Sequence, residues 1–399
     1  IYEMFKIQTL NKISPKGLRE FPHEKYEVAS EFSNPDAILL RSFEMHGMNI
    51  PSSVKAIGRA GAGTNNIPIE LMDKKGIPVF NTPGANANAV MEMVLCALLI
   101  SSRPVIKAAE WTKSLKGKGD NIPELCEKGK SQFKGPELRG KTLGIIGLGA
   151  IGTKVANAAS ALKMNVIGYD PFISVDAAWG LSRRVHKAEN LDSLLAQSEY
   201  ITIHIPQTPD TKGLINANSI KTMKDQIRII NFARGGLVVN TDIIKALKSG
   251  KVASFITDFT DEELLHAENA ICLPHLGAST PEAEDNCAMM AVKELRDFLE
   301  TGAIQNSVNF PRCTIDTPIP QNGTRLCISN KNVPNMVSQI TSLLAANNQN
   351  ISGMINRNRN NLAYNIMDID GEVTQETIEA LQSIKAVINV RAIYESKPN

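Results

Sequence analysis

Residues 142–152 read TLGIIGLGAIG, and this stretch decides the fold that we expect. A run of apolar, strand-favouring residues leads directly into Gly147, Gly149 and Gly152, which have the spacing G-x-G-x-x-G. A helical pattern, AIGTKVANAASALK, follows. The motif alone is a weak signal because glycine-rich turns are common. With a strand before it and a helix after it, however, it has the context of a dinucleotide-binding βαβ unit.

Each glycine has a physical task in such a unit. Gly147 permits the tight turn, Gly149 lets the main chain approach a pyrophosphate, and Gly152 allows close packing of helix on sheet. The helix N-terminus supplies N–H groups and the positive end of the helix dipole. The next expected strand ends in Asp170, eighteen residues after Gly152. A carboxylate there accepts hydrogen bonds from the adenosine ribose and repels a 2′-phosphate, so the sequence predicts NAD rather than NADP.

A second glycine-rich stretch, GRAGAG at residues 58–63, does not complete this pattern. Position 66 is Asn rather than Gly, and no acidic residue ends a strand at the right distance. We interpret it as a loop whose main-chain N–H groups lie near a small anion.

Composition narrows the class of protein. The 399 residues suit two or three domains, and a net charge of +2 is too balanced for a nucleic-acid or membrane-surface protein. The longest apolar run, residues 89–100, is short for a membrane span, and the first residues lack the pattern of a secretory signal. The six cysteines show no C-x-x-C pairing or metal-ligand spacing. We therefore expect reduced thiols, no metal and a cytoplasmic location.

Apolar strand patterns alternate with helical patterns along the chain, which predicts parallel α/β sheets. The segment 111–141, rich in Lys, Gly and Pro, is expected to be an exposed connection. A helix is expected to open at Ser279, which has capping-box spacing with Glu282, and to run to about Thr301. After a linker, the order strand, helix, strand, strand, helix, strand predicts a small ferredoxin-like module.

Arg234 interrupts the apolar stretch IINFARGGLVV at residues 229–239. The two glycines after it place a turn there, so the arginine lies at the carboxyl end of its strand, the edge where open α/β sheets bind ligands. A guanidinium binds a carboxylate bidentately and stays charged at any working pH. The alternative is a structural arginine paired with a local acid.

Polar residues also follow two further strands. His275 ends a short strand in CLPHLGAST, and Glu263 lies beyond the strand that ends at Asp258. A carboxylate beside an imidazole favours its protonated form and fixes its tautomer. Spacing alone does not separate Glu263 from the neighbouring acids at 261 and 262, and His204 competes with His275 for the catalytic role.

Taken in order, the glycine fingerprint, Asp170, HIPQTPDTKGLI, INFARGGLVV and PHLGAST resemble the D-2-hydroxyacid dehydrogenase family. The resemblance covers nearly all of residues 1–310, and the C-terminal module is similar to an ACT domain. It implies a Rossmann-type NAD-binding domain, a flavodoxin-like substrate domain into which it is inserted, a linker, and a ferredoxin-like (ACT) regulatory domain. The implied boundaries are 101–275 for the NAD-binding domain, 1–100 with 276–310 for the substrate domain, 311–323 for the linker and 324–399 for the ACT domain.

The resemblance also assigns site residues. The catalytic residues that it implies are Arg234, Glu263 and His275. Those implied for the cofactor, with Asp258 at the nicotinamide carboxamide, are Gly147, Gly149, Ala150, Ile151, Gly152, Asp170, His204, Pro206, Thr211, Ala233, Asp258, Gly277 and Ala278. Those implied for the substrate are Arg41, Ser42, Arg59, Gly61, Ala62, Gly63 and Asn86, of which Arg41 and Arg59 are the candidates for a phosphate group.

The chain departs from the family pattern in the ACT-like module. The ligand loop, often His-Glu-Asn-x-Pro-Gly, reads NKNVPN at residues 330–335. Asn332 and Asn350 remain available to bind an amino-acid effector, and Asn335 replaces the glycine, a position where a loop with positive φ tolerates Asn better than most residues.

The implied activity is hydride transfer between NAD and a small phosphorylated 2-hydroxy acid, in a homodimer or homotetramer. A related reductase of unphosphorylated hydroxy acids and a non-catalytic NAD(H)-sensing protein are the alternatives.

Overall fold

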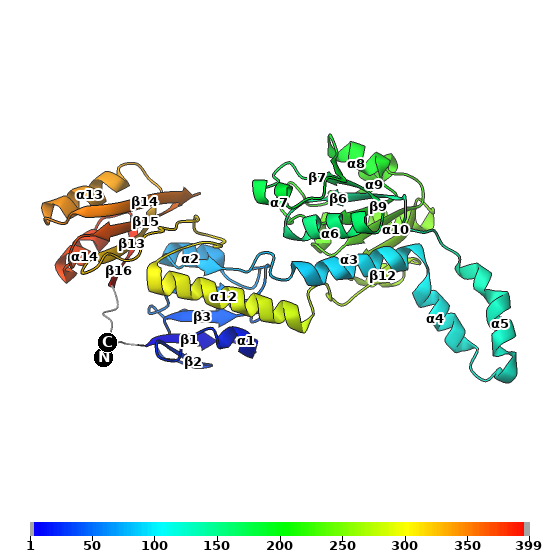
Figure 1. The fold of residues 1–399 in the computed structure, drawn as a ribbon, viewed down its shortest axis with the longest axis horizontal. Helices are drawn as coiled ribbons and strands as arrows, with labels where there is room; N and C mark the ends of the chain where they lie inside the picture. The colour runs from blue at the N-terminus through cyan, green and yellow to red at the C-terminus, as the bar shows by residue number, and fades with distance from the viewer. Residues whose placement is uncertain (1–3, 395–399) are drawn as a thin grey trace. The chain divides into compact units, whose positions relative to one another are not determined.

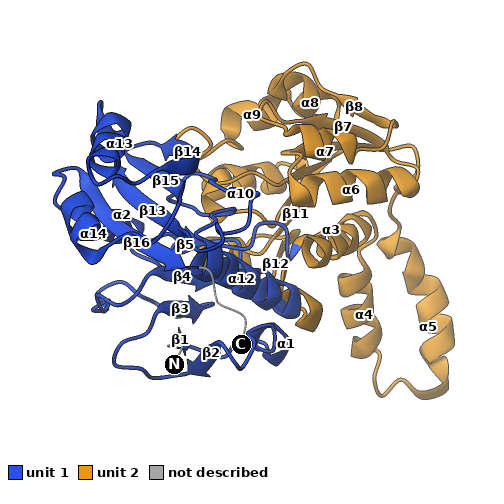
Figure 2. Ribbon diagram, turned by 60° about the vertical axis from the view of Figure 1, so that its left-hand side comes forward, with its two compact units in different colours: residues 1–86, 284–399 blue, residues 87–283 orange. Residues whose placement is uncertain are grey.

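The computed structural model describes residues 4–394, which form two compact units (Figure 2). Unit 1 comprises the described residues of Ile1–Asn86 and Glu284–Asn399, and unit 2 is Ala87–Ala283. Figure 1 labels the helices and strands of both units where there is room for a label.

Unit 2 is built on a seven-stranded parallel sheet in the order β12-β11-β10-β9-β6-β7-β8. Counted from β6, the first six strands have the Rossmann order 3-2-1-4-5-6, so the predicted dinucleotide-binding fold is confirmed. The strands are β6 (Thr142–Ile146), β7 (Asn165–Tyr169), β8 (Val185–Lys187), β9 (Tyr200–Ile203), β10 (Ile227–Asn231), β11 (Val252–Thr257) and β12 (Ala270–Cys272). The helices are α3 (Ala87–Ser102), α4 (Val105–Ser114), α5 (Ile122–Gly129), α6 (Ala150–Ala161), α7 (Val175–Trp179), α8 (Leu191–Gln197), α9 (Ala217–Thr222), α10 (Asn240–Lys248) and α11 (Glu262–Leu265), with short 3₁₀ helices at Gly119–Asn121, Lys130–Phe133 and Gly235–Leu237.

The helix α3 belongs to unit 2, although the implied NAD-binding domain begins only at residue 101. Its buried residues Val94 and Leu98 share one hydrophobic core with Val155 of α6 and Ile145 of β6. Burial of this apolar face ties α3 to the seven-stranded sheet.

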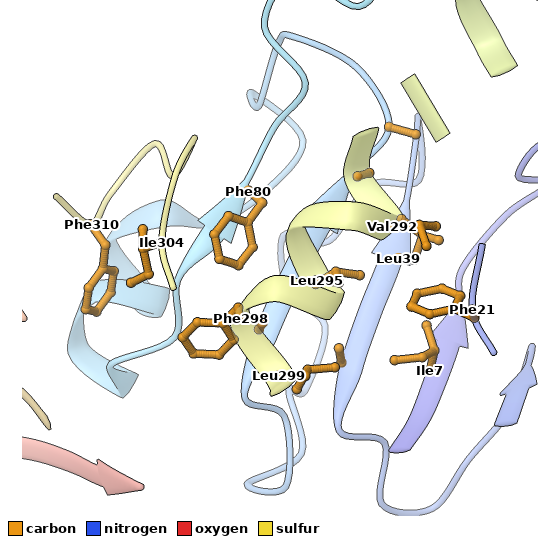
Figure 3. Close-up of a cluster of buried hydrophobic side chains, with 14 of the residues drawn as sticks. Ile7, Phe21, Leu39, Phe80, Val292, Leu295, Phe298, Leu299, Ile304 and Phe310 are labelled. Carbon is orange, nitrogen blue, oxygen red and sulfur yellow. The ribbon is translucent and has the colours of Figure 1, made fainter. Parts of the chain in front are cut away.

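Unit 1 contains a five-stranded parallel sheet in the order β2-β1-β3-β4-β5, which is the flavodoxin-like order 2-1-3-4-5. The long helix α12 covers it, and Figure 3 shows Val292, Leu295 and Leu299 of this helix among the side chains of one core. The elements are β1 (Phe5–Thr9), α1 (Pro15–Leu18), β2 (Tyr26–Ala29), β3 (Ala37–Leu40), β4 (Ala56–Arg59), α2 (Ile69–Lys75), β5 (Val79–Phe80) and α12 (Pro281–Thr301).

The second sheet of unit 1 is antiparallel and four-stranded, in the order β14-β15-β13-β16. With its two helices it has the expected order βαββαβ, so the ferredoxin-like arrangement is confirmed and is compatible with an ACT domain. The elements are β13 (Thr324–Lys331), α13 (Met336–Ala346), β14 (Ile351–Arg359), β15 (Leu362–Ile369), α14 (Gln375–Gln382) and β16 (Val387–Tyr394).

Buried polar contacts attach this sheet to the rest of unit 1. Arg325 of β13 pairs with Asp368 of β15 at 2.7 Å and donates to the Thr317 carbonyl at 2.8 Å. The Tyr364 hydroxyl donates to the Gly302 carbonyl at 2.9 Å, just after α12 ends. The Arg391 guanidinium donates to main-chain carbonyls in the last turns of α12. The sheet therefore holds the end of that helix.

Three expectations about local structure were wrong or incomplete. The segment 111–141 is mostly exposed, as expected, but largely helical; Pro104 and Pro123 stand at helix starts, where a proline costs no hydrogen bond. The strands β1, β2 and β8 were not predicted. The cap of α12 is Thr280, whose Oγ1 accepts from the Ala283 amide at 3.1 Å, rather than Ser279.

Among residues 4–394, no single helix is long and apolar enough to cross a membrane, although α3 and α4 together, bent by 62°, meet the length and composition criteria.

The buried carboxyl of Glu294 in α12 generates a stability prediction. Its Oε1 accepts from the Asn306 amide, its Oε2 has no hydrogen-bond partner among the described residues, and burial raises the pKa of Glu294 to about 7. A pKa raised in the folded state stabilises the fold at low pH, and this contribution is lost as pH rises from about 4.5 through 7. Glu294→Gln should therefore raise the melting temperature at pH 8, by a free energy on the order of 2 kcal/mol, and leave it almost unchanged at pH 5.

Scanning calorimetry at both pH values measures the effect. Glu124→Gln, at an exposed glutamate of α5, is the control and should change neither melting temperature. Equal changes at pH 5 and pH 8 for Glu294→Gln would contradict the prediction.

Candidate active site

The predicted catalytic and cofactor residues all follow the carboxyl ends of strands in the seven-stranded sheet of unit 2. Because the strands are parallel, these ends meet at one edge of the sheet. The residues are Gly147–Gly152 after β6, Asp170 after β7, His204, Pro206 and Thr211 after β9, Ala233 and Arg234 after β10, Asp258 and Glu263 after β11, and His275, Gly277 and Ala278 after β12.

The glycines of this loop are of two kinds: those that the fold itself requires and one that leaves space for a ligand. A Cβ at Gly147, whose φ is 93°, would lie 2.6 Å from the His204 carbonyl oxygen, and a Cβ at Gly152 would lie 2.0 Å from the Gly147 carbonyl oxygen. The fold itself requires both. No described atom lies within 4 Å of a Cβ built at Gly149, which is the N-cap of α6. Gly149 therefore faces open space where a pyrophosphate would meet the helix N-terminus.

The Asp170 carboxylate organises the same loop. Its Oδ2 accepts from the Leu148 amide at 2.8 Å, and its Oδ1 accepts from the Phe172 amide at 2.9 Å. Each carboxylate oxygen can accept more than one hydrogen bond, so acceptor capacity remains for ribose hydroxyls. Sequence reasoning missed this structural role of Asp170 because the donors are main-chain groups.

Asp258 tests whether the site suits a nicotinamide dinucleotide. The side chain is buried, and its Oδ2 accepts from the Gly277 amide at 2.7 Å. Its Oδ1 is also buried but has no hydrogen-bond partner among the described residues. An unpaired buried acceptor is costly, and a carboxamide NH₂ such as that of nicotinamide would satisfy it. The residues present therefore fit this cofactor.

Other predicted cofactor residues shape the same edge. The Thr211 hydroxyl donates to the Pro206 carbonyl at 2.8 Å and so closes the turn after β9. Ala150 and Ile151 form the first turn of α6, the turn next to the open space at Gly149.

The two candidate histidines have different environments. His204 Nε2 shares a hydrogen bond of 2.9 Å with the Thr202 hydroxyl, and burial lowers the pKa of His204 to about 3. It is therefore uncharged and a poor proton acceptor at neutral pH. His275 is exposed, its ring takes part in no hydrogen bond with another described residue, and its φ is 55°. A non-glycine residue in the left-handed region is strained, and such strain is frequent at functional sites. His275 is the better acid–base candidate.

The three neighbouring acidic residues also differ in their contacts. Asp261 is the N-cap of α11, where its Oδ1 accepts from the Leu264 amide at 2.9 Å. Glu262 pairs with His266 at 3.0 Å. Glu263 has no hydrogen bond or ion pair with another described residue and remains available. The structure does not join Glu263 to His275 by a hydrogen bond.

Arg234 is exposed, and its Nη1 donates to the Ala233 carbonyl at 2.7 Å. It has no ion pair with an acid among the described residues, which argues against the alternative of a structural arginine. The remaining guanidinium N–H groups can bind a carboxylate.

The predicted substrate residues lie in unit 1, also after strand ends. Arg41 and Ser42 follow β3, Arg59 ends β4, residues 61–63 follow it, and Asn86 follows β5. The guanidinium of Arg41 pairs with Glu284 at 2.6 Å, so part of its charge is already balanced.

Three asparagines that sequence reasoning missed hold these loops. Asn66 accepts from Arg59 Nε at 3.3 Å and donates to the Arg41 carbonyl at 3.1 Å. Asn11 accepts from the Arg41 amide at 2.9 Å, and Asn81 donates to the Ala62 carbonyl at 2.6 Å. Asn66 lies three residues after the glycine-rich stretch 58–63, and the sequence analysis noted this position only because it lacks a glycine.

The amides predicted to bind an effector are both engaged. Asn332 donates to the Asn360 carbonyl at 3.0 Å, and Asn350 donates to Asp370. Asn335 has φ of 68°, so its backbone is left-handed, as expected for a residue in place of glycine.

Among residues 4–394, no group of three or more His, Cys, Asp or Glu side chains could hold a metal ion.

Comparison with known proteins gives a family match and named relatives. Residues 95–277 match the sequence model of the D-isomer specific 2-hydroxyacid dehydrogenase, NAD binding domain. The chain is 36% identical to D-3-phosphoglycerate dehydrogenase of Archaeoglobus fulgidus over 71% of this chain and 53% of that protein. It is 34% identical to the Homo sapiens enzyme of the same name over 73% of this chain and 54% of that protein. The chain thus spans about half the length of these curated relatives.

Solved structures give the same fold. A cofactor (NAD+)-bound 3-phosphoglycerate dehydrogenase of Entamoeba histolytica is similar with a TM-score of 0.61 and 26% identity, covering 77% of this chain and 99% of that one. The D-mandelate dehydrogenase of Rhodotorula graminis in its holo form has a TM-score of 0.66 at 22% identity, covering 78% of this chain and 99% of that one.

The glycine geometry predicts opposite effects for two substitutions. Gly149→Ala should leave the melting temperature unchanged, because its Cβ meets no described atom, yet weaken NADH binding by on the order of 10-fold, because the methyl group occupies the approach to the pyrophosphate. Gly152→Ala should lower the melting temperature, because its Cβ would collide with the Gly147 carbonyl. Calorimetry and titration of NADH fluorescence measure both quantities; unchanged NADH affinity in Gly149→Ala would refute the assignment.

Proposed function

Since residues 95–277 belong to the D-isomer specific 2-hydroxyacid dehydrogenase family, we propose that the chain catalyses NAD-dependent oxidation of 3-phospho-D-glycerate to 3-phosphooxypyruvate. This is the first step of phosphorylated L-serine biosynthesis. The relatives named D-3-phosphoglycerate dehydrogenase support this choice of substrate within the family.

One observation carries the chemistry of the proposal. At a single sheet edge lie a guanidinium without an ion pair, an exposed imidazole and a carboxylate without a hydrogen bond or ion pair, as far as residues 4–394 show, beside a site that suits a nicotinamide dinucleotide. A cation, a titratable base and a hydride acceptor are what the oxidation of a 2-hydroxy acid needs.

Bound NAD would supply the hydride acceptor. The Arg234 guanidinium would bind the substrate α-carboxylate and polarise the oxygen on C2. The substrate alcohol would then lose its hydroxyl proton to the ring of His275 and the hydrogen on C2 as hydride. The Glu263 carboxylate would stabilise the imidazolium that results. In the reverse direction His275 returns the proton to the carbonyl oxygen.

The phosphate group distinguishes this substrate from simpler 2-hydroxy acids. For it we propose Arg41 and Arg59, supported by their charge and by the main-chain N–H groups of the GRAGAG loop.

We also propose a homodimer or homotetramer and a cytoplasmic location. The helices α4 and α5 support self-association, because neither contains a buried residue although the apolar residues Val105, Ile106 and Trp111 lie on α4.

An amino-acid effector at the ACT-like module, such as L-serine, would have to displace the hydrogen bonds that Asn332 and Asn350 make. Calorimetry with L-serine tests that binding.

The substrate proposal is tested by NADH oxidation. The rates of wild-type protein are compared with three 2-oxo acids: 3-phosphooxypyruvate, hydroxypyruvate and glyoxylate. We expect the highest kcat/KM for the phosphorylated substrate. Preference for hydroxypyruvate or glyoxylate would instead identify a reductase of unphosphorylated acids, and NADH binding without turnover on any 2-oxo acid would indicate an NAD(H)-sensing protein.

The catalytic roles predict that Arg234→Ala and His275→Ala each lower kcat/KM by on the order of 10²-fold or more, because each removes a group that interacts with the developing charge. Steady-state kinetics with the preferred 2-oxo acid measure the loss. His266→Ala, at an exposed histidine of the same unit, is the control and should retain activity. Turnover near that of wild type in either catalytic variant would overturn its role.

A further inference from the structure

Two buried polar residues stand side by side beneath the catalytic loops. Asn231 ends β10 and Thr257 ends β11, and they are register partners in the parallel ladder. Each residue is 1% exposed. Neither residue belongs to the predicted catalytic or cofactor set, so their polar groups must serve another purpose.

The Asn231 amide holds the turn that carries Arg234. Its Oδ1 accepts from the Ala233 amide at 3.1 Å, and its Nδ2 donates to the Arg234 carbonyl at 2.9 Å. One side chain thus fixes the main chain on both sides of the Cα of Arg234. The guanidinium itself is exposed, so its placement depends on this main chain.

The Thr257 hydroxyl holds the neighbouring turn. Its Oγ1 accepts from the Phe259 amide at 3.1 Å. The Phe259 ring meets the imidazole of His275 edge to face, with 5.3 Å between ring centroids, and its Cβ would lie 3.1 Å from a Cβ built at Gly235. Phe259 is therefore packed between the histidine loop and the residue that follows Arg234. Since the His275 ring has no hydrogen bond with another described residue, this aromatic contact restricts its orientation.

We propose that Asn231 and Thr257 are positioning residues that set the mutual placement of the two catalytic groups. Asn231 acts through the main chain of Arg234, and Thr257 acts through the Phe259 ring on the imidazole of His275. The inference rests on the proposed function for its kinetic consequence, and its geometric part concerns His275 whether or not the protein turns over. A displacement of about 1 Å at a reacting group can cost on the order of 10²-fold in rate.

The sharpest test uses a pair of substitutions at Thr257. Thr257→Val is nearly isosteric and removes the acceptor, whereas Thr257→Ser keeps it. We expect Thr257→Val to lower kcat about 10-fold with an unchanged dissociation constant for NADH, and Thr257→Ser to restore kcat to within about twofold of wild type. Ser198→Ala is the matched control, because it removes a buried hydroxyl that donates to the Leu194 carbonyl, just before β9 at the opposite edge of the same sheet. It should retain full kcat.

A second readout does not depend on turnover. The imidazole ring-proton signals of each histidine are followed by NMR at fixed pH, with His275 assigned from the His275→Asn spectrum. Thr257→Val should shift the ring-proton signals of His275, because the Phe259 ring lies against that imidazole, and leave those of exposed His186 unchanged. Thr257→Ser should return the His275 signals to their wild-type positions. Asn231→Leu should lower kcat/KM for the 2-oxo acid, and if that variant does not fold, the Thr257 pair still decides.

The outcomes separate the two claims. If wild type has no dehydrogenase activity but the His275 ring-proton signals respond as described, the proposed function fails and the positioning role stands. If Thr257→Val matches wild type in kcat and in the His275 signals, or loses only thermal stability, the positioning role is overturned.

Discussion

A hydrogen bond of 2.7 Å between the Asp258 carboxylate and the Gly277 amide underlies the arrangement of the site. It joins the end of β11 to the loop after β12, two residues beyond His275. A Cβ at position 277 would lie 2.9 Å from that same carboxylate oxygen, so only glycine allows the contact without displacement. Since the second oxygen of Asp258 is left buried and unpaired, one carboxylate both anchors the histidine loop and presents an acceptor to a cofactor. The cost of burying it is offset only in part until a donor arrives.

The fold could be predicted where the sequence fixes both periodicity and turn chemistry. The glycine fingerprint, the alternation of strands and helices and the βαββαβ order each correspond to observed elements, because every one depends on local patterns. The helices α4 and α5 could not be predicted from a Lys- and Gly-rich composition, since their prolines act at helix starts. The short strands β1, β2 and β8 have too few residues for a clear period, and pairing with neighbours far along the chain stabilises them.

In the candidate site, too, some residues could be predicted from the sequence and others could not. Arg234, His275 and Asp170 could be located because residues after parallel strands share an edge. Spacing did not separate Glu263 from its neighbours; the capping of α11 by Asp261 and the pairing of Glu262 with His266 do. The supporting residues could not be predicted, because the partners of Asn231 and Thr257 are main-chain atoms of the turn that follows each strand, and most partners of Asn66 are main-chain carbonyls of another loop. A side chain that bonds to backbone leaves no partner residue type to find in a sequence.

The helix α12 is held twice within unit 1, along its length by the core in Figure 3 and at its end by Tyr364 and Arg391 of the antiparallel sheet. Successive residues of an α-helix are rotated by about 100°. One residue inserted between these two attachments would turn the final carbonyls away from their donors while the apolar face stayed seated. Insertions and deletions among chains of this architecture should therefore occur after Gly302 and in surface turns. The segment from Val292 to Thr301 should keep a constant number of residues.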